Sequence, residues 1–155
     1  MRNRELTRQL QKLRALAKKA GDSSLSDLEL QAHWAKYLCV LVAGFLENSL
    51  VEIFSEFVSA ASSPAVARFA TSRLENIQNP KAQRFVEVSG AFDESWGPEL
   101  EAFLADNGRK DAIDSIMSNR HLIAHGSSSG ITLARVNQYL DKCVEVVDFI
   151  ETQCK

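Results

Sequence analysis

The chain has 155 residues, of which 45% are hydrophobic and 25% are charged, and its formal net charge is −2. These values are close to the averages for globular proteins and exclude wholesale disorder. Seven glycines and three prolines are few for a loop-rich all-β protein and favour long helices. The length suits one domain, and we expect residues 1–155 to form it.

The charge is distributed unevenly along the chain. Residues 1–20 carry seven basic side chains and one acid, a net +6, so the remainder carries −8. We expect a basic N-terminal helix over 1–21 and a helical core over 27–153. The basic helix either steers the protein toward phosphate or is simply a solvated amphipathic helix. With no secretory signal and no apolar run longer than Tyr37 to Leu46, we expect a cytoplasmic protein without membrane contact.

The first half of the chain predicts two helices. Leucines at helical spacing indicate a helix from Arg4 to about Ala20 that ends at Gly21. Ser26 and Glu29 have the spacing of a capping box. A long central helix then runs from Asp27 to about Ala61.

Prolines and asparagines divide the middle of the chain. Ser63-Pro64 predicts the start of a helix that ends near Glu75, and Asn79-Pro80 predicts a turn before a short helix to about Val88. The segment Ser89 to Pro98 predicts a loop held by Trp96. Helical patterns resume over 99–104 and, after Asn107-Gly108, over 109–125.

The last helix follows a break at residues 126–130. Thr132 is its predicted cap, and its apolar residues recur in steps of three and four. The fold class is therefore all-α, a bundle built on two long helices with shorter connecting helices. Cys39, Cys143 and Cys154 lack CxxC spacing, so neither a disulfide framework nor a zinc ribbon is indicated. We expect the protein to use no metal and no cofactor. The predicted stripe of the last helix is Leu133, Val136, Leu140, Cys143, Val147 and Ile150.

One short segment concentrates the residues suited to chemistry. Arg120, His121 and His125 lie within six positions of each other, just before a glycine. Arginine binds phosphate through planar, permanently charged donors, and histidine exchanges protons near neutral pH. Two alternatives stand: the histidines have a metal-ligand spacing, or they merely end the helix while Arg120 pairs with an acid.

The same segment carries a family resemblance. Arg120-x4-His125 resembles the Rx4-6H signature of the HEPN superfamily, small all-α domains of which many are ribonucleases. Residues 114–151 are similar to the RiboL-PSP-type branch, in which RxxIAHG precedes a short loop, a GITL-like helix start and a long amphipathic helix. The central segment AGFLENSLVEIFSEFV fits the second helix of that family, so the resemblance covers about Leu28 to Glu151.

The resemblance implies a metal-independent endoribonuclease in which the 2′-hydroxyl attacks the phosphate and leaves a 2′,3′-cyclic phosphate. His125 would transfer protons, and Arg120 would hold the phosphate. His121 would either help to hold the phosphate or assist protonation. Asn119 and Asn48 are weaker supporting candidates. Glu47 shares a helix face with Val40, Gly44, Val51 and Phe54, so it needs a partner. It either orients the motif or forms a salt bridge at the rim.

Geometry adds a prediction about assembly. On a regular helix Arg120 and His125 lie about 140° apart and roughly 7.5 Å apart along the axis, so one helix does not aim both at one phosphate. The resemblance implies a homodimer whose two motifs form a composite site on RNA, in a toxin–antitoxin or anti-phage setting. An antitoxin or neighbour-encoded protein is a further predicted partner. The alternative is a non-catalytic HEPN dimer that binds RNA or a protein, or serves assembly.

Overall fold

Helices account for nearly the whole molecule. The computed structural model describes residues 1–155 and contains seven helices, 79% of the chain, with no strand, so the all-α prediction is confirmed. The helices are α1 (Arg4–Ser23), α2 (Leu28–Ala61), α3 (Pro64–Leu74), α4 (Ala82–Phe92), α5 (Trp96–Ala105), α6 (Arg109–Ala124) and α7 (Leu133–Gln153).

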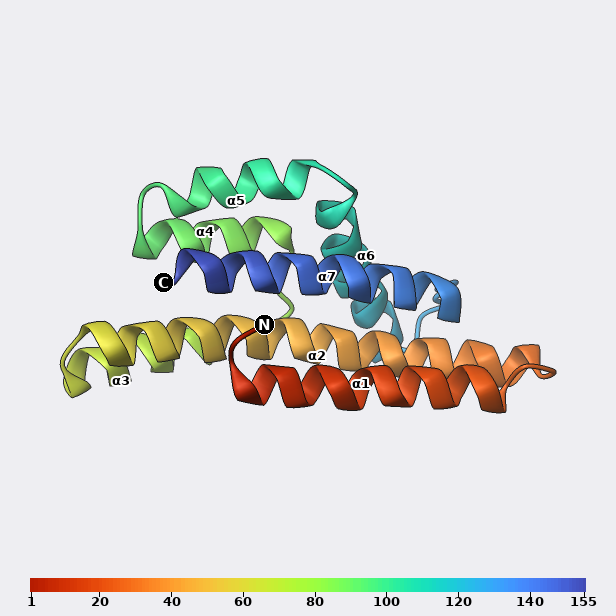
Figure 1. Cartoon of the computed structure of the whole chain (residues 1–155). Helices are drawn as coiled ribbons and strands as arrows, with labels where there is room; N and C mark the ends of the chain where they lie inside the picture. Colours follow the sequence, from red (N-terminus) through yellow and green to blue (C-terminus); the bar gives the residue numbers. More distant parts are fainter.

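The long helix α2 is the centre of the arrangement (Figure 1). Helices α1 and α7 run beside it, α6 crosses it, and α3 folds back along its C-terminal part. Helices α4 and α5 form a hairpin that packs against α6 and α7. At the crossing of α2 and α6, the Cys39 thiol donates to the carbonyl of Ile116 at 3.5 Å. Cys39 and Cys143 are both fully buried, and burial raises the pKa of the Cys39 thiol to about 11.

Helix α2 is long and apolar enough to cross a membrane, judged by length and composition only. Its most apolar 18-residue window has a mean hydropathy of 1.6. This window is longer than the unbroken apolar run from Tyr37 to Leu46. Over half of that window, 56%, is buried inside the fold. The apolar surface of α2 is therefore used to build the core.

Helix starts follow from their capping residues. The Thr132 hydroxyl accepts a hydrogen bond from the N–H of Arg135, and Pro64 occupies the first position of α3, both as predicted. The predicted capping box of Ser26 and Glu29 is wrong. Asp27 caps α2 instead, because its carboxylate accepts the N–H of Leu30 at 2.9 Å and its charge suits a helix N-terminus.

Gly21 does not end α1, contrary to the sequence prediction. The helix continues to Ser23, and the hydroxyl of buried Ser24 donates to the carbonyl of Ala20 at 2.6 Å. This side-chain bond satisfies a carbonyl at the helix end without a left-handed glycine.

The predicted loop over Ser89 to Pro98 is mostly helical. Helix α4 continues to Phe92 and α5 begins at Trp96, so only three residues connect them. A Cβ atom on Gly97 would lie 3.3 Å from Cα of Gly90, so the missing side chains allow the two helices to pack closely. Trp96 anchors the hairpin as predicted, with its ring 5.3 Å from that of Phe57.

A buried carboxylate joins the first and last helices. Glu151 on α7 is 5% exposed and accepts the backbone N–H groups of Arg2 at 2.6 Å and Asn3 at 2.9 Å. Asn3 in turn caps α1 by accepting the N–H of Leu6. The basic helix α1 is thereby fixed against the bundle.

The close approach of α4 and α5 predicts opposite effects for two glycine substitutions. Gly97→Ala should lower the free energy of unfolding by about 1–3 kcal/mol, because its methyl group meets the backbone of α4. Gly21→Ala should raise it by roughly 0.5–1 kcal/mol, because no atom lies within 4 Å of the new Cβ and alanine favours the helix. Urea unfolding of both variants measures this, and equal effects at the two positions would contradict the packing described.

Candidate active site

The end of α6 has a defined hydrogen-bonded geometry. Gly126 adopts φ +67°, its N–H donates to the carbonyl of Ile123, and the N–H of Ser127 donates to that of Leu122 at 2.9 Å. This pair of bonds is a Schellman motif, in which glycine at the left-handed position avoids a Cβ clash. His125 is the last residue before the turn, and its own N–H still bonds to the carbonyl of His121.

The three motif side chains lie on two faces of α6. His121 and His125 are exposed, and their rings lie side by side with centroids 4.4 Å apart and planes tilted by 55°. Arg120 is half-buried, on the face that also carries buried Ile113, Ile116 and Met117. The structure therefore brings the two histidines together and separates them from Arg120, in keeping with the helical geometry expected from the sequence.

None of these three side chains has a partner within the protein. The side chains of Arg120, His121 and His125 form no hydrogen bond and no ion pair. The alternative that Arg120 pairs with an acid is therefore wrong. The guanidinium and both imidazoles are free to bind a ligand.

Asn119 connects the motif to the loop that follows. Its Nδ2 donates to the carbonyl of Ser115 at 2.8 Å, and its Oδ1 accepts the hydroxyl of Ser129 at 2.7 Å. Ser129 Oγ also accepts the N–H of Ile131. Asn119 thus fixes the loop 126–130 against α6, and Ser129 is a supporting residue that the sequence pattern did not identify.

Glu47 contacts a different part of the fold. Its carboxylate accepts the backbone N–H of Asn79, which has φ +51°, and it forms no bond to Arg120 or His125. It forms no salt bridge either, so neither role predicted for it is seen in the single chain. Asn48 lies on the exposed side of α2, where its amide donates to Gln9 at 3.4 Å.

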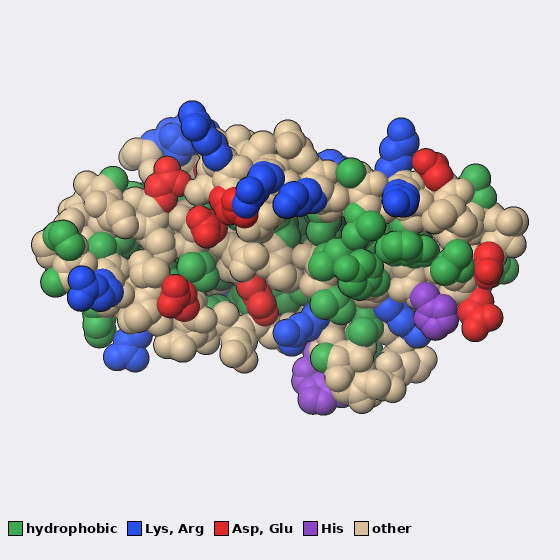
Figure 2. Space-filling view, turned by 90° about the horizontal axis from the view of Figure 1, so that it is seen from below, with side chains coloured by type: hydrophobic (Ala, Val, Ile, Leu, Met, Phe, Trp, Pro, Cys, Tyr) green, Lys and Arg blue, Asp and Glu red, His purple; other side chains and the backbone are tan.

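The face of α2 around Glu47 is less buried than the sequence suggested. Val40 is 37% exposed and Tyr37 is 53% exposed, whereas the hydroxyl of Ser55, further along α2, accepts a hydrogen bond from the hydroxyl of Thr71 on α3 at 3.1 Å. The reason is that different helices cover different lengths of α2. In Figure 2 apolar side chains gather on this face, with Lys and Arg side chains above and below them and histidines at the lower edge.

We name this patch the α2 apolar face, and it consists of Trp34, Tyr37, Val40, Leu41 and Gly44. A hollow of about 310 Å³ between α1 and α2, lined partly by Leu16 and Phe45, extends it toward α1. Leu122, two residues after Arg120, is 38% exposed.

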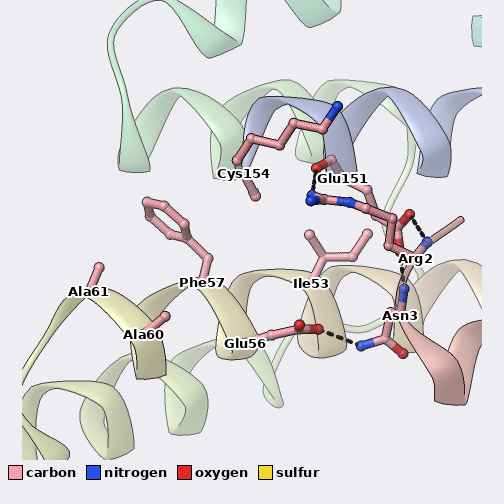
Figure 3. Close-up of a pocket in the computed structure, with 10 residues that line it drawn as sticks. Arg2, Asn3, Ile53, Glu56, Phe57, Ala60, Ala61, Glu151 and Cys154 are labelled. Carbon is pink, nitrogen blue, oxygen red and sulfur yellow. Dashed lines mark hydrogen bonds between the residues drawn. The ribbon is translucent and has the colours of Figure 1, made fainter.

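A second hollow, of about 320 Å³, lies far from the motif (Figure 3). It is formed by the C-terminal part of α2 and the two chain ends, and its floor is Ile53 and Phe57. Its polar groups already bond to one another: Asn3 donates to Glu56 at 2.8 Å, and the Arg2 guanidinium donates to the carbonyl of Glu151. This hollow serves the attachment of α1 and α7.

A comparison with protein families gives one match. The family model described as RiboL-PSP-HEPN matches residues 4–155. The match extends the predicted resemblance to include α1. No match was found among curated proteins or among solved structures.

The role of Asn119 leads to a prediction about the loop 126–130. Asn119→Ala removes the acceptor of the Ser129 hydroxyl, so backbone amides of residues 127–131 should exchange hydrogen about tenfold faster, as expected for the loss of one hydrogen bond. Hydrogen exchange followed by mass spectrometry measures this. Ser118→Ala, at a neighbouring hydroxyl without a hydrogen bond, is the control, and equal exchange in both variants would contradict the role of Asn119.

Proposed function

Because the chain belongs to the RiboL-PSP-HEPN family, we propose that it is a metal-independent endoribonuclease of the cytoplasm. The RNA would supply its own nucleophile, the 2′-hydroxyl next to the scissile phosphate. The products would carry a 2′,3′-cyclic phosphate and a 5′-hydroxyl. A toxin–antitoxin or anti-phage setting, and a controlling partner protein, stay predictions from the family resemblance.

The observation that carries this proposal is the unpaired Arg120. Arg109, the other half-buried arginine, pairs with Glu145 at 2.7 Å, and the remaining arginines without a carboxylate partner are exposed to solvent. Arg120 is half-buried and has none. A partly desolvated cation is unfavourable unless an anion balances it, and a phosphodiester suits the planar donors of a guanidinium.

The neighbouring imidazoles supply the proton transfers that the reaction needs. One base takes the proton from the 2′-hydroxyl while O2′ bonds to phosphorus. The bond from phosphorus to O5′ breaks, and an acid gives O5′ a proton. We assign His125 to proton transfer, with His121 beside it as a second group, and Arg120 to the charge that develops on the phosphate oxygens.

A homodimer would complete this site. Arg120 lies on a different face of α6 from His125, so a shared site needs Arg120 of one protomer and His125 of the other. The α2 apolar face lies at the same surface and leaves Tyr37 and Val40 exposed to water. Burial of these side chains against a second copy favours association of this kind.

The first prediction from this proposal concerns cleavage. In EDTA, the protein should cut a labelled single-stranded RNA and leave a cyclic phosphate. His125→Ala should reduce the rate by roughly 10²–10⁴-fold, and Arg120→Ala by roughly 10²–10³-fold, because they remove proton transfer and charge stabilisation. Gel electrophoresis and mass spectrometry of the products measure both.

Matched controls separate this effect from general loss of charge. His33→Ala and Arg8→Ala remove an exposed histidine and an exposed arginine elsewhere, and they should cleave like the wild type. A folded wild-type dimer that leaves RNA intact would reject the enzyme and favour the binding or assembly module.

Subunit mixing tests the composite site. Arg120→Ala and His125→Ala homodimers should each be inactive, but a mixture allowed to exchange subunits should recover about a quarter of wild-type activity. Half of the dimers are then mixed, and one of the two sites in each mixed dimer is intact. A mixture that stays inactive after exchange, shown by native mass spectrometry, would contradict sharing of the site.

A further inference from the structure

An open polar cleft of about 670 Å³ lies between the end of α3 and the start of α4. We name it the α3–α4 cleft, within residues 73–87. Arg73, Lys81 and Arg84 line it against a single acid, Glu87, so its lining is positive although residues 21–155 carry a net −8. The other polar lining residues are the amides Asn76, Gln78, Asn79 and Gln83.

Two of the three cations in this cleft are available to a ligand. Arg84 pairs with Glu87 at 3.0 Å, whereas Lys81 is exposed and has no partner. The guanidinium of Arg73 has no carboxylate partner and lies over the ring of Phe69, 5.0 Å from its centroid. Phe69 is 62% exposed, so an aromatic ring stands beside a free cation at the edge of the cleft.

The cleft is tied to the helix that carries the motif. The N–H of Asn79 donates to Glu47 on α2, and the N–H of Ala82 donates to Asp114 on α6 at 2.8 Å. These bonds fix the segment that connects α3 to α4 beside α2 and α6 (Figure 1).

A stripe on the outer face of α6 leads from this attachment point to the histidines. Asp114, Ser118, His121 and His125 follow each other at steps of four, three and four, which places them on one side of the helix. Asp114 and His121 are seven residues apart, so the cleft begins about 10 Å from His121 along the axis.

We propose that the α3–α4 cleft binds the RNA strand on one side of the scissile phosphate. Lys81 and Arg73 contact backbone phosphates, and Phe69 stacks on a base. This inference rests on the proposed ribonuclease function and describes how the same site holds its substrate. Free cations, side-chain amides and an exposed aromatic ring are the groups with which proteins bind single-stranded RNA.

Binding is best measured where cleavage cannot interfere. A fluorescein-labelled single-stranded RNA of mixed sequence is titrated with His125→Ala protein, alone or combined with Arg73→Gln and Lys81→Gln. Both positions are exposed, and neither side chain caps a helix. Arg135→Gln with Lys155→Gln in the same background removes two exposed positive charges without carboxylate partners, outside both the cleft and α1, and is the matched control.

The cleft variant should bind about tenfold more weakly, and its salt slope should fall by about 1.4, since each lost phosphate contact on a single strand removes about 0.7. The control should bind within about twofold of the parent. Unchanged binding by the cleft variant would overturn the inference, as would equal losses in both variants, because net charge alone then sets the affinity.

Cleavage by the same variants with His125 intact separates the two proposals. If the wild type cleaves RNA and the cleft variant has an unchanged KM, RNA binding by the cleft is rejected and the ribonuclease proposal stands. Wild type that binds the RNA through the cleft without cutting it would support the cleft and reject the ribonuclease. If the His125→Ala protein does not bind RNA, RNA binding by the cleft is rejected. The ribonuclease proposal is then tested by wild-type cleavage alone.

Discussion

The need to cover α2 determines most of this structure. A 34-residue helix with apolar side chains around much of its circumference cannot be buried by one neighbour, so different helices cover different lengths of it. α1, α6 and α7 pack along its N-terminal and central parts, and α3 folds back over its C-terminal part. One face stays uncovered where Tyr37 and Val40 are exposed, and Figure 2 shows histidines beside this face. The site and the exposed apolar side chains therefore share one surface because of how the core is built.

The end of α6 carries the residues of the candidate site. Gly126 stops the helix directly after His125, and the last turn leaves both imidazoles in solvent while Arg120 faces the bundle. The same turn is stabilised by the bond from Ser129 to Asn119. A rigid helix end carries the titratable groups, and the loop beyond it contributes no charged side chain. The separation of Arg120 from the histidines is thus a property of the helix itself.

Local signals predicted much of the fold, and contacts between distant segments account for what they missed. Pro64, Thr132 and Gly126 act on their own helix ends, so their effects were readable from the sequence. The motif was found because its residues are adjacent in the chain. The hydrogen bonds between Glu47 and Asn79 and between Asn119 and Ser129 depend on how the helices pack, so the spacing of residues along the chain does not predict them. Gly90 and Gly97 resembled loop residues because close helix packing and flexible loops both select glycine.

The distribution of ion pairs connects the fold to its proposed chemistry. Arg8, Arg14, Arg84 and Arg109 each pair with a carboxylate, which balances much of the positive charge of the molecule internally. Arg120, Arg73 and Lys81 are among the cations left without acids; Arg120 belongs to the motif, and Arg73 and Lys81 line the α3–α4 cleft. An acidic protein repels a polyanion unless unpaired cations line the surface that binds it. Under the two proposals, these three cations would balance the charge of an RNA strand that reaches from the motif to the α3–α4 cleft.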